Sequence, residues 1–135
     1  MPVFFDTNVL VYCIDPRDSH KQTQAQHLVR QAALSAEGVI STQVLIELYN
    51  VLGRKLRVPD VERLAVVKAY MGWPVIDSDL ALVTAAMEKS VRHQITIFDA
   101  MVVEAALRSG ATTLYSEDLQ HGQRFGSLTI TNPFF

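Results

Sequence analysis

Four acidic residues stand near the ends of short apolar segments or on the buried sides of helices, where neutral side chains are usual: Asp6, Glu47, Asp99 and Asp118. Carboxylates are rarely buried unless a positive charge joins them. Two of them about 4 Å apart repel by as much as about 4 kcal/mol at a moderate effective dielectric. If these acids converge in the fold, a divalent cation or shared protons must therefore offset the repulsion.

The chemistry that such a cluster predicts is metal-assisted phosphoryl transfer. No His or Cys accompanies the acids at ligand spacing, which argues against zinc. An all-oxygen site suits Mg²⁺ or Mn²⁺, which retain several waters and bind phosphate oxygens. Such an ion helps to deprotonate water and stabilises the charge that develops on a phosphodiester.

Two of the acids lie on predicted helices. Asp99 is followed by apolar residues three, four and seven positions later, which places it on the buried stripe in the first turn. The alternative is a helix cap, and the helix dipole favours a carboxylate there in either case. Glu47 borders the apolar stripe of its helix, which favours a place in the site. The alternative interpretation is that Glu47 is exposed and pairs with Arg54.

The other two acids follow predicted strands. Asp6 comes directly after an apolar run, where an N-cap or an Asx-turn is the commonest use of Asp. Asp118 comes shortly after a strand, and its alternative is a solvated loop acid. The sequence leaves open whether Glu117 or Asp118 points inward, and we choose Asp118.

Basic residues that could contact an anionic substrate are few. Arg54 belongs to the only basic cluster, at residues 54–57, for which compensation of the helix dipole is the slightly preferred alternative. Arg124 follows Asp118 closely and is a second candidate, although an ordinary loop position is the safer interpretation. We predict Arg54 and Arg124 as substrate-binding residues on these grounds.

Short apolar runs alternate with helical patterns along the chain. We predict strands at Val3–Phe5, Val39–Ser41, Val75–Asp77, Thr112–Tyr115 and Leu128–Thr131. We predict helices at residues 18–36, 42–57, 60–71, 79–93 and 98–109. In the helix at residues 79–93 we predict that Leu80, Val83, Met87 and Val91 face inward. This alternation predicts one domain over residues 1–135, a three-layer α/β/α fold with a short, mainly parallel central sheet. In such sheets the ligand site lies beyond the carboxyl ends of the strands.

Composition sets further bounds on the protein class. A chain of 135 residues, 49% hydrophobic and 19% charged, is ordinary for one globular domain. No apolar run approaches the roughly 18 residues that span a bilayer, and the lone Cys13 excludes a disulfide within the chain. We therefore expect a cytoplasmic protein without a membrane partner. The net charge of −2 argues against a nucleic-acid binder, unless the surplus acid is concentrated in a metal site.

The order and spacing of short motifs resemble those of the PIN domain, and most closely the VapC-like toxins of bacterial toxin–antitoxin pairs. The resemblance covers the whole chain and rests on Glu47 together with the segments Phe5-Asp6-Thr7-Asn8-Val9-Leu10, Phe98-Asp99-Ala100 and Ser116-Glu117-Asp118. It implies a PIN-like nuclease domain that acts as a metal-dependent endoribonuclease on RNA.

The same resemblance implies roles for individual residues. Asp6, Glu47 and Asp99 would surround Mg²⁺ or Mn²⁺, with Asp118 as the fourth acid. Asn8 and Ser116 would support the site. The resemblance further implies a homodimer and an antitoxin partner that blocks the site.

Two other functions remain to be weighed. An Asp-nucleophile phosphatase resembles a D-x-D-x-T pattern, but Asn8 replaces the second Asp and no Thr stands at position 10. A catalytically silent module of the same fold would only bind RNA or protein. The intact set of acids argues against lost catalysis, and the weak basic cluster argues against tight stand-alone RNA binding.

Overall fold

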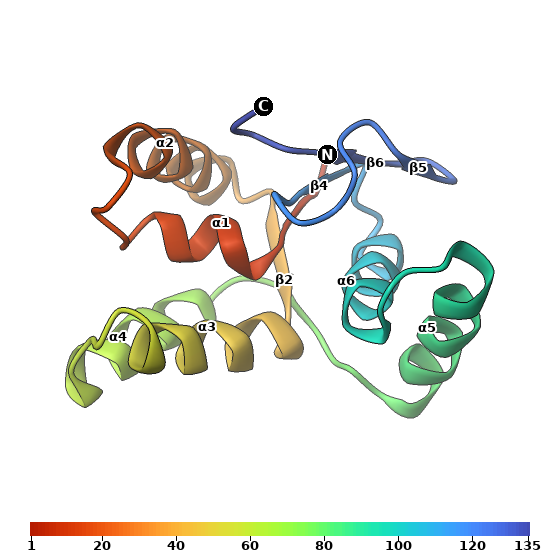
Figure 1. The fold of residues 1–135 in the computed structure, drawn as a ribbon, viewed down its shortest axis with the longest axis horizontal. Coiled ribbons are helices and arrows are strands. Elements are labelled where there is room, and N and C mark those ends of the chain that lie inside the picture. Colours follow the sequence, from red (N-terminus) through yellow and green to blue (C-terminus); the bar gives the residue numbers. More distant parts are fainter.

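A computed structural model describes residues 1–135 and shows strands flanked by helices (Figure 1). The strands are β1 (Val3–Phe5), β2 (Gly38–Ser41), β3 (Val75–Ile76), β4 (Thr113–Tyr115), β5 (Arg124–Phe125) and β6 (Leu128–Thr131). The helices are α1 (Thr7–Tyr12), α2 (Ser19–Ser35), α3 (Thr42–Arg54), α4 (Asp60–Tyr70), α5 (Leu80–His93) and α6 (Ile97–Arg108). None of them combines the length and the apolar character needed to span a membrane.

The strands form one sheet with the order β3-β2-β1-β4-β6-β5. All neighbouring strands are parallel except the β5–β6 pair, which is antiparallel. β1 lies inside the sheet, where Phe4 stands opposite Val39 on one side and Leu114 on the other. Phe4 and Phe5 have no exposed surface, as expected for a parallel sheet that is covered on both faces.

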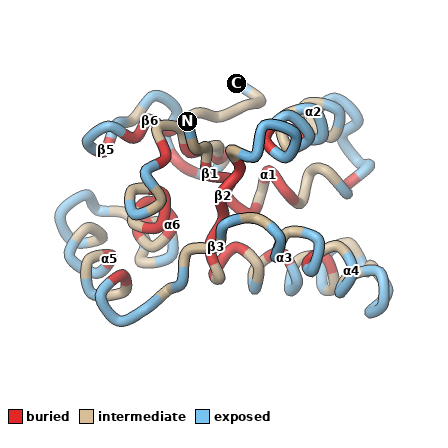
Figure 2. Tube along the Cα trace, turned by 180° about the vertical axis from the view of Figure 1, so that it is seen from behind, coloured by how far each residue is buried: buried red, intermediate tan, exposed pale blue.

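The helices form the two outer layers. α1 to α4 lie on one side of the sheet, and α5 and α6 lie on the other (Figure 1). Seen from behind, the buried residues concentrate in the strands and on the inner sides of the helices, while the outer turns are exposed (Figure 2). The predicted three-layer α/β/α fold with a mainly parallel sheet is confirmed.

Two short elements were not predicted. α1 has only six residues and β5 only two, so neither is long enough to show a period in the sequence. α1 matters most, because it begins directly after Asp6 and carries Asn8.

The predicted inward side of α5 is wrong for most of its members. Leu80, Met87 and Val91 are 81%, 51% and 74% exposed, whereas Leu82 and Ala86 are buried. The reason is that α5 packs mainly against α6 instead of the sheet. A narrow contact with one helix buries only the small part of α5 around Leu82 and Ala86.

Gly38 in β2 provides a test of the packing beneath the sheet. A Cβ atom on Gly38 would approach Trp73 Cζ3 to 2.5 Å. Gly38→Ala therefore overpacks this contact, and we expect it to lower the free energy of unfolding by about 1–3 kcal/mol. Urea unfolding followed by the fluorescence of Trp73, the only tryptophan, measures this loss.

The matched control is Gly72→Ala, where the nearest atom to an added Cβ is the Ala69 carbonyl oxygen at 3.7 Å. This ordinary contact predicts a change below about 1 kcal/mol. Equal losses from the two variants would contradict the packing described here.

Candidate active site

Asp6 lies where β1 ends and α1 begins, and its two oxygens have different partners. Oδ1 accepts the backbone N–H of Thr7 at 2.8 Å and so caps α1. Oδ2 accepts hydrogen bonds from Ser116 Oγ at 2.8 Å and from Asn8 Nδ2 at 3.2 Å. Asp6 therefore caps a helix and also belongs to a buried polar network at the carboxyl end of β1.

Asn8 connects α1 to the loop that follows β4. Its Nδ2 donates to Asp118 Oδ2 at 3.1 Å, and its Oδ1 accepts the backbone N–H of Glu117 at 3.0 Å. Ser116 Oγ in turn accepts the backbone N–H of Asp118 at 3.2 Å. These bonds hold the loop so that Asp118 lies beside the partners of Asp6.

Glu117 is engaged elsewhere. Its carboxylate accepts from Tyr12 Oη at 2.7 Å and from Lys21 Nζ at 2.6 Å, a pairing that neutralises its charge. Of the two neighbouring acids, only Asp118 bonds to Asn8 through its carboxylate, which faces the network around Asp6.

Glu47 reaches the same region from α3. It is partly buried, and its Oε1 accepts from Thr7 Oγ1 at 3.3 Å. Arg54 forms no ion pair with it, so the alternative of an exposed helix pair does not apply.

Asp99 lies in the first turn of α6, and the cap of this helix is another residue. Thr96 Oγ1 accepts the backbone N–H of Asp99 at 3.1 Å, which leaves the partly buried Asp99 carboxylate available to the site. Gln43 Nε2 donates to the Phe98 carbonyl at 3.1 Å and ties α3 to the start of α6. The elements that carry Glu47 and Asp99 are thereby fixed to each other.

The pKa values show that the carboxylates interact. The pKa of Asp6 is raised to about 6, mainly by burial and also by the charges of Glu47 and Asp118, which outweigh the lowering by the hydrogen bonds from Ser116 and Thr7. Burial also raises the pKa of Glu47, with smaller contributions from Asp99 and Asp118. The pKa of Asp99 is raised by burial first and then by Asp118. The structure therefore brings the predicted acids together at the carboxyl end of the sheet.

The chemistry of this donor set fits a hard divalent cation. All the donors are carboxylate oxygens, and three of the groups have pKa values that disfavour the ionised form, which a bound cation reverses. As placed here, no three His, Cys, Asp or Glu side chains are close enough to ligate one ion.

A cavity of about 300 Å³ opens beside the acids. Glu47 and Asp118 line it, and so do two cations that we did not predict as substrate-binding residues, Arg17 and Lys55. Lys55 belongs to the basic cluster at residues 54–57, from which we chose Arg54. Arg17 gave no such signal, because it follows a helix that was not predicted.

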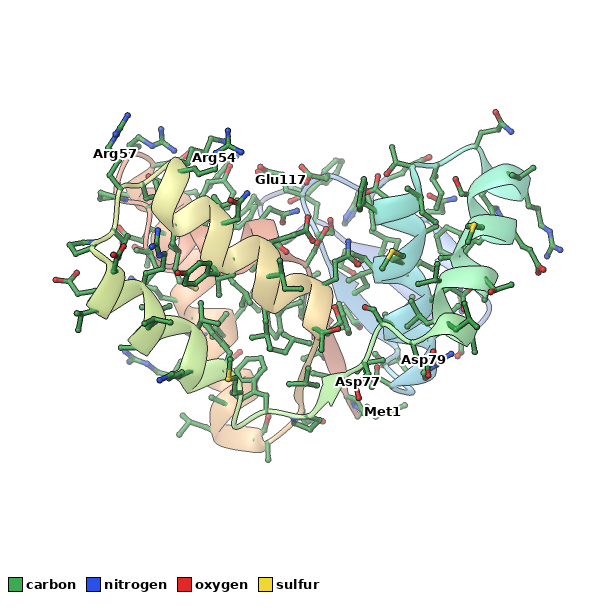
Figure 3. All side chains as sticks on the ribbon, turned by 90° about the horizontal axis from the view of Figure 1, so that it is seen from below. Met1, Arg54, Arg57, Asp77, Asp79 and Glu117 are labelled. Atoms are coloured by element: carbon green, nitrogen blue, oxygen red, sulfur yellow. The ribbon has the colours of Figure 1, made fainter.

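The predicted substrate residues Arg54 and Arg124 are exposed and do not line this cavity. Arg54 and Arg57 lie near the C-terminal end of α3 and extend away from the body of the protein (Figure 3). Contact of Arg54 and Arg124 with a substrate stays a prediction.

The fold and this cluster define a compact parallel α/β domain with an acidic site at the carboxyl ends of its strands. The sequence matches the PIN domain over residues 3–124, and the chain belongs to this family. PIN domains of this type are nucleases that act on RNA. No curated protein sequence matches the chain.

Several solved structures share the fold. VapC20 of Mycobacterium tuberculosis, a toxin that cleaves the sarcin–ricin loop, is 22% identical, with a TM-score of 0.70 over 86% of this chain and 89% of that chain. A DNA-bound VapBC from Salmonella typhimurium is 19% identical, with a TM-score of 0.69 over 98% of both chains. A toxin–antitoxin complex from Klebsiella pneumoniae is 17% identical, with a TM-score of 0.67 over 97% of both chains.

Removing the charge of Asp6 is expected to stabilise the metal-free protein at neutral pH. A raised folded-state pKa gives stability that is present below the unfolded value of 3.8 and is lost as pH rises through about 6. Asp6→Asn in EDTA should therefore raise the free energy of unfolding by about 1–3 kcal/mol near pH 8. This gain should shrink toward zero near about pH 4, and urea unfolding across this pH range measures it.

The control is Asp77→Asn, which changes an exposed acid outside the cluster (Figure 3). We expect no gain from it at any pH. A gain from Asp6→Asn that does not vary with pH would contradict the burial and repulsion assigned to Asp6.

Proposed function

We propose that the protein is a metal-dependent endoribonuclease that hydrolyses RNA phosphodiester bonds and acts as the toxin of a toxin–antitoxin pair. The observation that carries this proposal is the hydrogen-bond network that joins Asp6 to Asp118 at the carboxyl end of the sheet of a PIN domain. Glu47 and Asp99 lie close enough for their charges to raise pKa values within this cluster. Repulsion within such a cluster is otherwise unfavourable, and a substrate complex with a divalent cation relieves it.

In this proposal Asp6, Asp99 and Asp118 hold Mg²⁺ or Mn²⁺, which when bound supplies Lewis acidity and a more acidic water. Glu47 orients and deprotonates the attacking water. Its raised pKa brings it closer to the working pH of a general base. The Thr7 hydroxyl donates to Glu47 Oε1 at 3.3 Å and so orients this carboxylate.

Asn8 and Ser116 act as positioning residues. Both donate to Asp6 Oδ2, and Asn8 also holds Asp118. Because these donors are neutral, they orient the carboxylates without cancelling the negative charge that the cation requires.

The two alternatives are less well supported. An aspartyl nucleophile needs an uncommitted oxygen, but both oxygens of Asp6 accept hydrogen bonds from neighbouring groups. A silent binding module has no use for clustered carboxylates beside its cavity, because they repel RNA unless a cation is bound.

The proposed protein partners follow from the structural neighbours. Two of these are complexes of a toxin with its antitoxin, and this chain spans almost their full length. Exposed apolar side chains beside the site, Ile46 and Phe98, support a protein contact near Glu47. We propose an antitoxin partner and a homodimer on this basis.

Asp99→Asn is the direct test, because it keeps the shape of the side chain and removes its charge. We expect it to lower Mg²⁺- or Mn²⁺-dependent cleavage of single-stranded RNA about 100-fold or more. Gel analysis of an end-labelled RNA with either metal, and with EDTA, measures the loss.

Asp77→Asn, an exposed acid outside the cluster, is expected to cleave like the unmodified protein. A folded Asp99→Asn variant with undiminished metal-dependent cleavage would refute the assignment. If the unmodified protein binds RNA but cleaves it with neither metal, the binding module is the better description.

A further inference from the structure

We infer that Arg17 and Lys55 form a phosphate-binding end of a trough that leads away from the acids, and that an RNA strand lies along it. The inference rests on the proposed ribonuclease function. It extends that function by locating the part of the RNA backbone that flanks the cleaved bond.

The trough follows the side of α3 that begins at Glu47. Glu47, Val51 and Lys55 are spaced four residues apart, so they lie on one side of the helix, and all line the cavity of about 300 Å³. With a rise of 1.5 Å per residue, Lys55 lies about 12 Å along the axis from Glu47. The cavity therefore has an acidic end and a basic end.

The opposite wall comes from α1, which packs against α3. Asn8, Val11 and Asp15 line this wall in the same direction, and the backbone N–H of Asp15 donates to the Val11 carbonyl at 3.0 Å, continuing the helical path. Asn8 is bonded to Asp118 at the acidic end, and Asp15 stands at the other end beside Arg17. Both walls thus run from the acids to the cations.

A buried carboxylate organises the basic end. Asp15 is only 5% exposed, and it accepts from Arg17 Nε at 2.9 Å and from Arg17 Nη2 at 2.7 Å. The Arg17 hydrogen bonds hold the pKa of Asp15 below its usual range, with Lys55 adding a smaller effect. The one negative charge of Asp15 therefore faces the positive charges of both Arg17 and Lys55, so a net positive charge remains at this end of the cavity.

That charge is available to a ligand. The Arg17 side chain is 63% exposed and keeps N–H donors beyond those given to Asp15. Lys55 forms no ion pair, whereas Lys21 is paired with Glu117. Guanidinium and ammonium groups of this kind bind phosphate oxygens through charge-assisted hydrogen bonds.

The separation of charges suits a nucleic-acid strand. A phosphate at the acidic end requires the cation held by the carboxylates, whereas a phosphate a few nucleotides away requires no metal and meets Arg17 and Lys55. Arg54 is adjacent to Lys55 in sequence but does not line this cavity.

The test begins with Lys55→Gln, because this change leaves the Arg17–Asp15 pair intact. The matched control is Lys68→Gln, which removes the same charge from an exposed position on α4. Both are placed in the Asp99→Asn background so that single-stranded RNA is bound without cleavage, and fluorescence anisotropy gives Kd over a range of salt concentrations. We expect the slope of log Kd against log salt to fall by about 0.7 for Lys55→Gln and to stay unchanged for Lys68→Gln.

When Arg17→Gln is added to Lys55→Gln, the loss of slope should roughly double. When Arg30→Gln, a change at an exposed position on α2, is added instead, the slope should stay that of Lys55→Gln. In the otherwise unmodified protein, Lys55→Gln should raise KM for cleavage and leave kcat within about twofold. Equal slopes for Lys55→Gln and Lys68→Gln would overturn the inference about the trough. If the unmodified protein still cleaved RNA in that case, the proposed function would stand. The expected slopes without cleavage by any variant would uphold the trough and reject the nuclease.

Discussion

Repulsion among carboxylates at the carboxyl end of a parallel sheet is the constraint on which this structure depends. The main chain places Asp6 directly after a fully buried strand, where burial alone raises its pKa, and the neighbouring acids raise it further. Neutral donors then hold the group: Thr7 through its backbone, and Asn8 and Ser116 through their side chains. These hydrogen bonds orient the acids without removing their charge. Burial of these charges lowers the stability of the free protein, and we propose that a bound cation restores it.

The same hydrogen bonds explain why short elements suffice to build the site. α1 is only six residues long, yet Asp6 caps it and Asn8 anchors it to the loop after β4. The helix and the loop therefore form one unit around the end of β1. On the far side of that unit, Asp15 holds Arg17 in place, so the fold that gathers the acids also sets a positive end opposite them.

The parts of the structure that the sequence predicts are those decided locally. Apolar runs bounded by turn residues predict the strands, and the acids that follow them belong to the carboxyl end of the sheet by topology alone. Contacts between distant segments decide the rest. Glu117 and Asp118 are equivalent in sequence, and their roles are separated by partners from distant segments: Tyr12 and Lys21 bind the Glu117 carboxylate, and Asn8 binds that of Asp118. Similarly, α5 rests on α6, which no pattern within α5 reveals, and Lys55 becomes part of a cavity only because α1 packs beside α3.

The most direct measurement is the position of Mn²⁺ in crystals soaked with this ion, located by its anomalous scattering. The account predicts a peak bounded by the carboxylates of Asp6, Asp99 and Asp118, at metal–oxygen distances of about 2.0–2.3 Å. A peak that contacts only one of these residues, or Mn²⁺ bound elsewhere while the acids remain apart, would contradict it.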